Sequence, residues 1–392
     1  MEAVMTDHAP ARQSVLSGLS GNEMYCIDML GYHPGNLLVG NSVFSRGFLG
    51  SMSAGFRGMV GGEITAITDI ITQGRHLSMQ RLIAEMQQHQ GHGATSVTTE
   101  LIFHSQNIEF LSVASTLHQK VGVPATAFTS ASDGQELFCQ VDAGYQPVSF
   151  VMGNVAYSIG VGRGITGAFK QMARGEVRQY SDLFGQTRNL ALQRIVDEAR
   201  SVGANVVVGI TTNILPFGGT AVQEMLMVGT ASRHDISDPA LAAMGVVTSD
   251  LTAEEMWSLA RIGYAPMKLV MGTSVYSLGF VGGITSAFKN FVKGEINELT
   301  QLIYGAREES LGKVRDQATA VGADDVIGIK TYVYDLGGGL IEFLAIGTAV
   351  KRTTAAHTVS EQLPPQAIVR DRDTFFNTAE RSYGVTLTEQ QQ

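Results

Sequence analysis

The sequence Gly144-Tyr145-Gln146-Pro147 decides the architecture, because it occurs three times in the 392-residue chain. The other copies are Gly31-Tyr32-His33-Pro34 and Gly263-Tyr264-Ala265-Pro266, so the offsets are 144 − 31 = 113 and 263 − 144 = 119. The same offsets relate three further sets: Gly40, Gly153 and Gly272; Glu63, Glu176 and Glu295; Arg75, Arg188 and Arg307. Such an internal period indicates a repeat protein. We divide the chain into repeat 1 (14–119), repeat 2 (128–234), repeat 3 (247–352) and a tail (353–392).

Each repeat is predicted to begin with a short helix. Three capping boxes carry this prediction: Ser20 with Glu23, Asp133 with Glu136, and Thr252 with Glu255. At this spacing, the N-cap oxygen and the glutamate carboxylate satisfy free amides of the first turn. The helix should end at the glycine of Gly-Tyr-x-Pro, since glycine accepts the left-handed C′ conformation and proline cannot continue a helix.

The remainder of each repeat reads as a small sheet with one long helix. In repeat 2 an apolar strand follows from Phe150 to Tyr157, then a short helical stretch at 165–173. A long amphipathic helix follows Gly175-Glu176. We place Glu176 in the first turn of this helix, and its equivalents Glu63 and Glu295 in the first turns of the other two long helices. The helix dipole stabilises a carboxylate at that position. Two strands, 206–215 and 222–232, join across Gly218-Gly219 as a hairpin. The predicted class is α+β with a mainly antiparallel sheet, whose edges remain available for neighbours.

Two glycine-containing motifs end repeats 2 and 3. Repeat 2 has Gly203-Ala204-Asn205-Val206-Val207-Val208-Gly209 and Gly229-Thr230-Ala231, and repeat 3 has Gly322-Ala323-Asp324-Asp325-Val326-Ile327-Gly328 and Gly347-Thr348-Ala349. Repeat 1 is the divergent copy, with Gly93-Ala94-Thr95. These residues resemble the YbjQ-like family, whose members are labelled heavy-metal-binding domains.

The resemblance implies a dodecin-like α+β unit. It also implies that single-domain members close into a five-membered ring, with their strands joining into a barrel. Three tandem units depart from that pattern. Two arrangements are compatible with three tandem units. Five chains could stack three rings, or consecutive repeats of one chain could share a single ring.

Composition excludes several classes of protein. The formal charge of -9 and the pI of about 5.5 argue against a dominant nucleic-acid-binding surface. Two cysteines cannot form a disulfide framework and suit a reducing compartment. The first 25 residues show no signal peptide, and no apolar run approaches the roughly 20 residues that span a bilayer. We therefore expect a cytoplasmic protein with no nucleic-acid or membrane partner.

Metal binding is the sharpest chemical hypothesis. His89 and His92 have a plausible spacing for two ligands of a divalent metal, although a solvated loop is the alternative because repeats 2 and 3 lack histidine there. Cys26 and Cys139 occupy equivalent positions, with Ser258 in the third copy, which favours core packing over a reactive thiolate. We expect no other cofactor.

No catalytic constellation recurs with the repeat. Gly162-Arg163-Gly164-Ile165-Thr166-Gly167 matches a dinucleotide-binding pattern, but the other two copies do not. Small residues at a tight connection explain it as well. An enzyme is therefore the least favoured class.

Two sets of charged residues recur in all three repeats: Glu109, Glu224 and Glu342 in the last strand, and Arg75, Arg188 and Arg307 on the long helix. We predict ion pairs between repeats. Plain solvent exposure and a ring of glutamate ligands facing a lumen are the alternatives.

These features together predict a non-enzymatic assembly protein that forms a closed homo-oligomeric ring, barrel or cage, with five-fold symmetry as one arrangement. A metal- or small-ligand-binding module is the alternative. The polar tail, residues 353–392, is interpreted either as a strap on its own assembly or as a partner-docking peptide.

Overall fold

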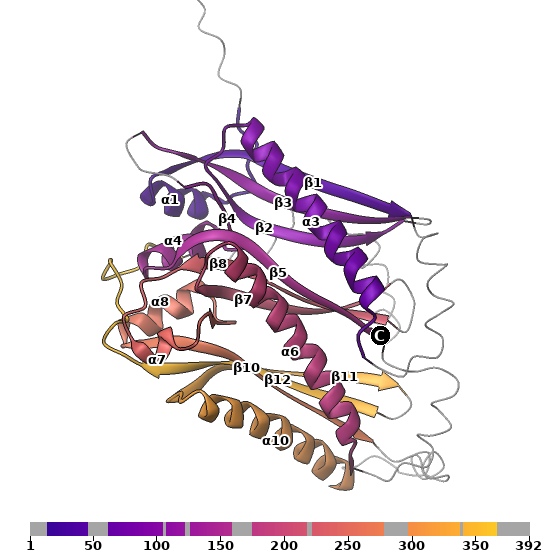
Figure 1. The fold of residues 1–392 in the computed structure, drawn as a ribbon. Coiled ribbons are helices and arrows are strands. Elements are labelled where there is room, and N and C mark those ends of the chain that lie inside the picture. Colours follow the sequence, from indigo (N-terminus) through magenta and orange to yellow (C-terminus); the bar gives the residue numbers. More distant parts are fainter. Residues whose placement is uncertain are drawn as a thin grey trace, which may run out of the picture.

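Three similar α+β units lie one after another along the chain (Figure 1). The computed structural model describes residues 14–45, 62–104, 107–121, 126–158, 175–217, 222–277, 297–337 and 340–366. Each unit contains a short helix, a sheet of three long antiparallel strands and a 24-residue helix. The predicted α+β class is confirmed.

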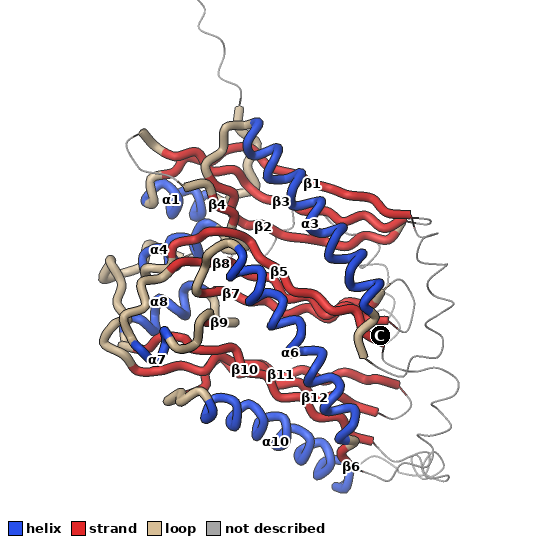
Figure 2. The backbone as a smooth tube through the Cα atoms, viewed as in Figure 1, coloured by secondary structure: helices blue, strands red, loops and turns tan. Residues whose placement is uncertain are grey.

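The elements follow the same order in each repeat (Figure 2). Repeat 1 comprises α1 (Gly21–Met29), β1 (Tyr32–Ser45), α3 (Thr65–Gln88), β2 (Gly93–Phe103) and β3 (Asn107–Gln119). Repeat 2 comprises β4 (Phe128–Thr129), α4 (Gly134–Asp142), β5 (Gln146–Ser158), β6 (Gly175–Glu176), α6 (Arg178–Ser201), β7 (Val206–Pro216) and β8 (Val222–Arg233). After α7 (Pro239–Ala242), repeat 3 comprises β9 (Val247–Thr248), α8 (Ala253–Arg261), β10 (Tyr264–Ser277), α10 (Asn297–Ala320), β11 (Asp325–Gly337) and β12 (Leu340–Arg352).

The short opening helices form as their caps predict. Ser20, Asp133 and Thr252 each accept the backbone amide of the glutamate three residues on, which in turn accepts the amide of the cap. The glycine after each helix has a positive φ, 84° at Gly31 and 85° at Gly144, which only glycine adopts without strain.

The first strand of each repeat pairs with the last, and the last pairs with the middle strand. The middle strand carries a bulge, between Val208 and Thr211 in repeat 2. Gly209 and Gly328 lie in these bulges with φ of 62° and 64°, and Ser96 has 56° in repeat 1. The bulge therefore explains why the YbjQ-like motif ends in glycine, and why repeat 1 reads as divergent there.

The long helix packs unusually close to the first strand of its own repeat. A side chain at Gly40, Gly153 or Gly272 would overlap backbone atoms of that helix, such as the carbonyl oxygen of Ala191 opposite Gly153. This close approach accounts for the recurrence of glycine at the position.

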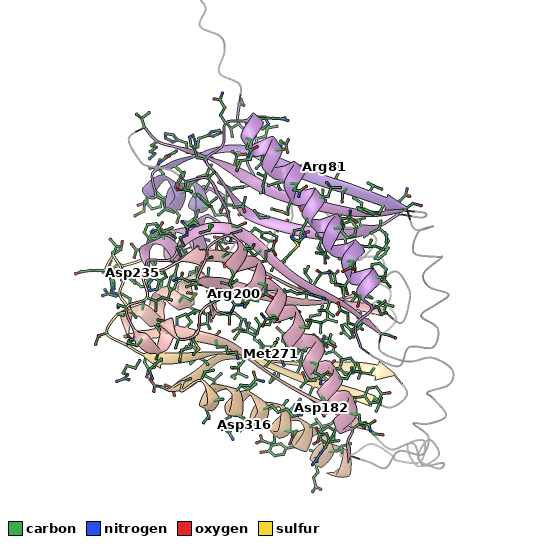
Figure 3. The ribbon with its side chains drawn as sticks, viewed as in Figure 1. Arg81, Asp182, Arg200, Asp235, Met271 and Asp316 are labelled. Carbon is green, nitrogen blue, oxygen red and sulfur yellow. The ribbon has the colours of Figure 1, made fainter. Side chains whose placement is uncertain are left out.

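The apolar core does not stop at the repeat boundaries. One cluster joins Val151 and Ile195 of repeat 2 to Met271 and Leu344 of repeat 3 (Met271 is labelled in Figure 3). Another joins Leu38 and Leu82 of repeat 1 to Phe150 and Met152 of repeat 2. The repeats are consequently one continuous array and not three self-sufficient domains.

Some predicted features lie outside the described residues: the short helical stretch at 165–173, the Gly162–Gly167 segment, the Gly218-Gly219 turn and Glu295. The helix α7 was not predicted. The tail begins as a strap, because Ser360 donates from its amide and its hydroxyl to the carboxylate of Asp142 on α4. Among the helices described, none has both the length and the apolar character to cross a membrane.

Candidate functional site at the repeat interfaces

The recurrent arginines and glutamates meet at the boundaries between repeats. Helix α3 of repeat 1 packs on β5 of repeat 2, and α6 of repeat 2 packs on β10 of repeat 3 in the same manner. Helices α3 and α6 therefore each lie over the sheet of their own repeat and the sheet of the next (Figure 1). This placement directs the middle of the helix toward the last strand of the following repeat.

Arg75 forms the first of two buried inter-repeat ion pairs. Its Nε and Nη2 donate to Oε1 and Oε2 of Glu224 at 3.1 and 2.8 Å. The side chains are 0% and 1% exposed. Nη1 donates to the hydroxyl of Thr99 at 3.0 Å. A bidentate guanidinium–carboxylate pair is the most directional of the charged hydrogen bonds, so it fixes the register of the two repeats.

Arg188 repeats the arrangement one unit further along. Its Nη2 donates to both carboxylate oxygens of Glu342 at 2.9 Å, and its Nη1 donates to the hydroxyl of Tyr157 at 3.0 Å. Burial by itself lowers the pKa of this guanidinium, but the nearby Glu342 and Tyr157 outweigh burial and raise the pKa. The arginine is therefore held as a cation in the interior.

The third members of both sets lie at the two ends of the array. Arg307 on α10 is exposed, and no residue in the described ranges forms an ion pair with it. Glu109 on β3 accepts instead from His104 and Asn41, at 2.8 and 3.2 Å. The hydrogen bond from His104 lowers the pKa of Glu109. Four of the six residues thus form two pairs between repeats, and the other two, Arg307 and Glu109, lie in the outer repeats.

A second ion pair accompanies each buried one, and the sequence interpretation of Glu63 and Glu176 was wrong. Both residues precede the long helices, which begin at Thr65 and Arg178 with no acidic residue in the first turn. Glu63 pairs with Arg194 of the next repeat at 2.7 Å (Nη2 to Oε1), and Glu176 pairs with Lys313 at 3.3 Å. They therefore bridge repeats and do not stabilise a helix dipole.

A sequence signal for these partners existed and was missed. Arg81, Arg194 and Lys313 have the repeat offsets, 194 − 81 = 113 and 313 − 194 = 119, and all are basic. Arg81 lies on α3 (Figure 3), and no carboxylate in the described part of the chain pairs with it. Arg81 instead donates to the backbone carbonyl of Asn41, and like Glu109 it lies at the repeat 1 end.

Short strand segments pass between repeats. At the start of repeat 2, β4 pairs in parallel with β2 of repeat 1, and β9 pairs in the same way with β7. In the opposite direction, β6 of repeat 2 adds antiparallel to β10 of repeat 3 (Figure 2). Each sheet is thus completed by two-residue strands from a neighbour, which confirms that the repeats borrow strands. Within the described residues, the three sheets are separate and do not merge into one barrel.

The opening helices form the other side of the interfaces. Helix α4 packs against both α1 and α8. Cys26 and Cys139 lie in one cluster with Phe138 and Trp257. Burial and the nearby Asp133 raise the pKa of the Cys26 thiol to about 11, and burial raises that of Cys139 further. Both cysteines are therefore packing residues, as the sequence favoured.

Comparison with known proteins identifies the family. A family model described as "Putative heavy-metal-binding", YbjQ, matches residues 33–116, 144–235 and 262–353. The chain belongs to the YbjQ family.

Three relatives illustrate the range of matches to this YbjQ protein. It is 29% identical over 242 residues to the encapsulin nanocompartment protein Rv1762c of Mycobacterium tuberculosis, a match that covers 60% of this chain and 89% of the relative. It is 40% identical over 96 residues to a UPF0145 protein of Pseudothermotoga lettingae, covering 23% of this chain and 86% of the relative. It is 40% identical over 83 residues to a UPF0145 protein of Vibrio campbellii, covering 21% and 77%. None of these names describes an enzyme.

The histidine pair suggested by the YbjQ label lies at the end of α3. His89 caps the helix and is exposed. His92 is also exposed, and its Nδ1 accepts the backbone amide of Gln119 at 3.3 Å. Within the described ranges, no three His, Cys, Asp or Glu side chains converge as metal ligands. Because structural zinc sites use four ligands, the described residues do not fit such a site.

Proposed function

We propose that this YbjQ protein is a non-enzymatic structural component that assembles with copies of itself into a closed ring, barrel or cage. The observation that carries the proposal is the buried Arg–Glu pair, which occurs at both repeat boundaries together with shared apolar clusters. The recurrent charged residues of both boundaries join one repeat to the next.

The energetics of these boundaries support an assembly role. A buried charge is tolerated only when its partner and its hydrogen bonds are in place. Each boundary therefore specifies one arrangement of two neighbouring units. A protein whose interfaces are so defined adds units in a fixed geometry, as an oligomer of repeated units requires.

The name of the M. tuberculosis relative, encapsulin nanocompartment protein, agrees with a role in assembly. The continuity of the three repeats also bears on the two arrangements left open by the sequence. Consecutive repeats in lateral contact support one ring that contains all three, and not three stacked rings built from five chains.

Mass photometry and native mass spectrometry at micromolar concentration test the proposal. We expect discrete species at whole-number multiples of the 41.9 kDa chain. A monodisperse monomer of 41.9 kDa would refute the assembly function.

A second candidate, a metal-binding module, is favoured only by the family description. Titration with zinc, copper and nickel, followed by elemental analysis, tests it. Stoichiometric uptake that is lost in His89→Ala with His92→Ala would support a site at these residues. The absence of uptake would remove it.

A further inference from the structure

The two boundaries between repeats inside the chain use equivalent residues. The outer surfaces of repeat 1 and repeat 3 can therefore be compared, position by position, with these internal boundaries. Several contacts at the first boundary recur at the second, among them the buried Arg–Glu pair, the second ion pair and a backbone hydrogen bond. For example, the Ile64 amide donates to the Ala156 carbonyl at 2.7 Å, and the Val177 amide donates to the Val275 carbonyl at the same distance. Val43 is the position in repeat 1 that corresponds to Ala156 and Val275.

The repeat 1 end exposes apolar residues whose counterparts are buried. Val43 is 56% exposed, whereas Ala156 and Val275 are 0% exposed. Tyr25 on α1 is 54% exposed, whereas its counterparts Phe138 and Trp257 are 4% and 8% exposed. These positions are covered in repeats 2 and 3 by the preceding repeat.

The segment before α1 shows the same contrast. Val15 and Leu16 occupy the positions that form the two-residue strand β4 in repeat 2 and β9 in repeat 3. Val15 is 44% exposed and Leu16 is 75% exposed, whereas the residues of β4 and β9 are at most 5% exposed. In β4 and β9 these residues pair in parallel with the middle strand of the preceding repeat. Within the described ranges, no strand pairs with residues 14–20.

The repeat 3 end carries the complementary surface. Ile329 on β11 is 42% exposed, whereas its counterparts Val97 and Ile210 are 3% and 2% exposed. In the sheets of this chain, β2 and β7 are each flanked by a strand from the next repeat, whereas β11 lies at the edge of its sheet. Arg307, exposed on α10, lies at the same end.

We infer that these two ends bind each other in different copies of the chain, head to tail, by the rule that joins the internal repeats. This inference rests on the proposed function and specifies its interface. Arg307 of one copy pairs with Glu109 of the next, as Arg75 does with Glu224 and Arg188 with Glu342. The partly exposed Glu109 carboxylate, which His104 and Asn41 contact within the single chain, and the exposed Arg307 guanidinium have opposite charges. The apolar residues at these two ends are those that the internal boundaries bury.

The backbone contacts follow from the same register. Val15 and Leu16 of the next copy add in parallel to β11 beside Asp325 and Val326, the positions that correspond to Val206 and Val207 of the β7–β9 pair. The Ile329 amide then donates to the Ser17 carbonyl. The internal equivalents are Val97 to Ser130 at 2.9 Å and Ile210 to Ser249 at 2.8 Å.

This interface fixes how units are counted. A head-to-tail contact closes into a ring when the rotation between units allows it. Because each chain contributes three repeats, the number of repeats in the ring is a multiple of three. The smallest ring of this kind contains two chains and six repeats, and a ring of five repeats is excluded.

Charge reversal tests the pairing in the full-length protein. We expect Arg307→Glu alone and Glu109→Arg alone to weaken assembly by about 100-fold or more, because every interface then brings like charges together. The double variant, with both reversals in one chain, should recover assembly. A mixture of the two single variants should also assemble, since each interface again has opposite charges.

The matched control is Asp316→Lys on the same helix α10 (Figure 3). Its counterpart Asp197 is 56% exposed on α6 and lies outside the internal boundary, so this charge reversal should leave the assembly mass unchanged. Circular dichroism should show that all variants retain the fold, because Arg307 is exposed and Glu109 is reached by water at 20% exposure.

The outcomes separate the inference from the proposed function. If the wild-type chain assembles and the single reversals leave its mass unchanged, the head-to-tail pairing is refuted while the assembly function stands. If the single reversals dissociate the assembly but neither the mixture nor the double variant recovers it, Arg307 does not meet Glu109. If the wild-type chain is a monomer, the proposed function itself fails.

Discussion

The buried pair of Arg188 and Glu342 should contribute strongly to the cohesion of repeats 2 and 3. In Glu342→Gln, the Arg188 cation keeps its hydrogen bond to Tyr157 but loses the carboxylate that contacts its Nη2 twice at 2.9 Å. Because Arg188 is 1% exposed, water cannot replace the lost charge. Breaking a buried pair on one side costs about 3–5 kcal/mol, and the amide oxygen of glutamine places this variant near about 3 kcal/mol.

Urea unfolding followed by circular dichroism, at one fixed protein concentration, measures this cost. Asp197→Asn is the control, because it removes the same charge from an exposed pair with Arg200 on the same helix and should cost at most about 1 kcal/mol. Arg188→Met combined with Glu342→Leu should recover most of the loss, since no buried charge remains. A cost for Glu342→Gln as small as that for Asp197→Asn would refute the reasoning.

Three further predictions concern packing, pH and the tail. Gly153→Ala should destabilise the protein by about 1–3 kcal/mol in urea unfolding, because the added methyl group overlaps α6. Gly185→Ala, whose methyl group meets no atom within 4 Å, should stabilise the protein by up to about 1 kcal/mol. Equal effects of the two substitutions would contradict the close packing of α6 on β5. The Glu198 carboxylate accepts a hydrogen bond from Nε2 of the protonated His76 and so raises the pKa of His76. This contact should add stability below about pH 6.5 and lose it as the pH rises through the raised pKa. Because both side chains are partly exposed, the contribution should be about 0.2–1 kcal/mol, and an unchanged pH profile of stability in His76→Gln would exclude it. Asp142→Ala should release residues 353–366 and speed their cleavage in limited proteolysis, and an unaltered cleavage rate would show that this carboxylate does not hold the strap.

Local sequence signals predicted the parts of the fold that depend on neighbours in the chain. Capping boxes placed the opening helices, and the repeat offsets placed the long helices and strands. The recurrent arginines and glutamates also predicted contacts between repeats. The predictions of helices and strands succeeded because capping residues and apolar periodicity lie within a single repeat.

The features that sequence reasoning missed depend on which residues of neighbouring repeats come into contact. Nothing local shows that Glu63 reaches Arg194, because the two are joined only when α6 lies beside the segment that precedes α3. The two-residue strands β4, β6 and β9 are equally hidden, since so short a pairing has no periodicity. Comparing basic positions across the repeats, as well as acidic ones, is the signal that would have found the second ion pair.

Electron microscopy of single particles tests the central claim most directly, because class averages count the repeats in one assembly. Equivalent repeats joined by one rule predict a closed ring whose number of units is a multiple of three, with six in the smallest. A ring of five units, or chains whose three repeats occupy separate layers, would contradict it.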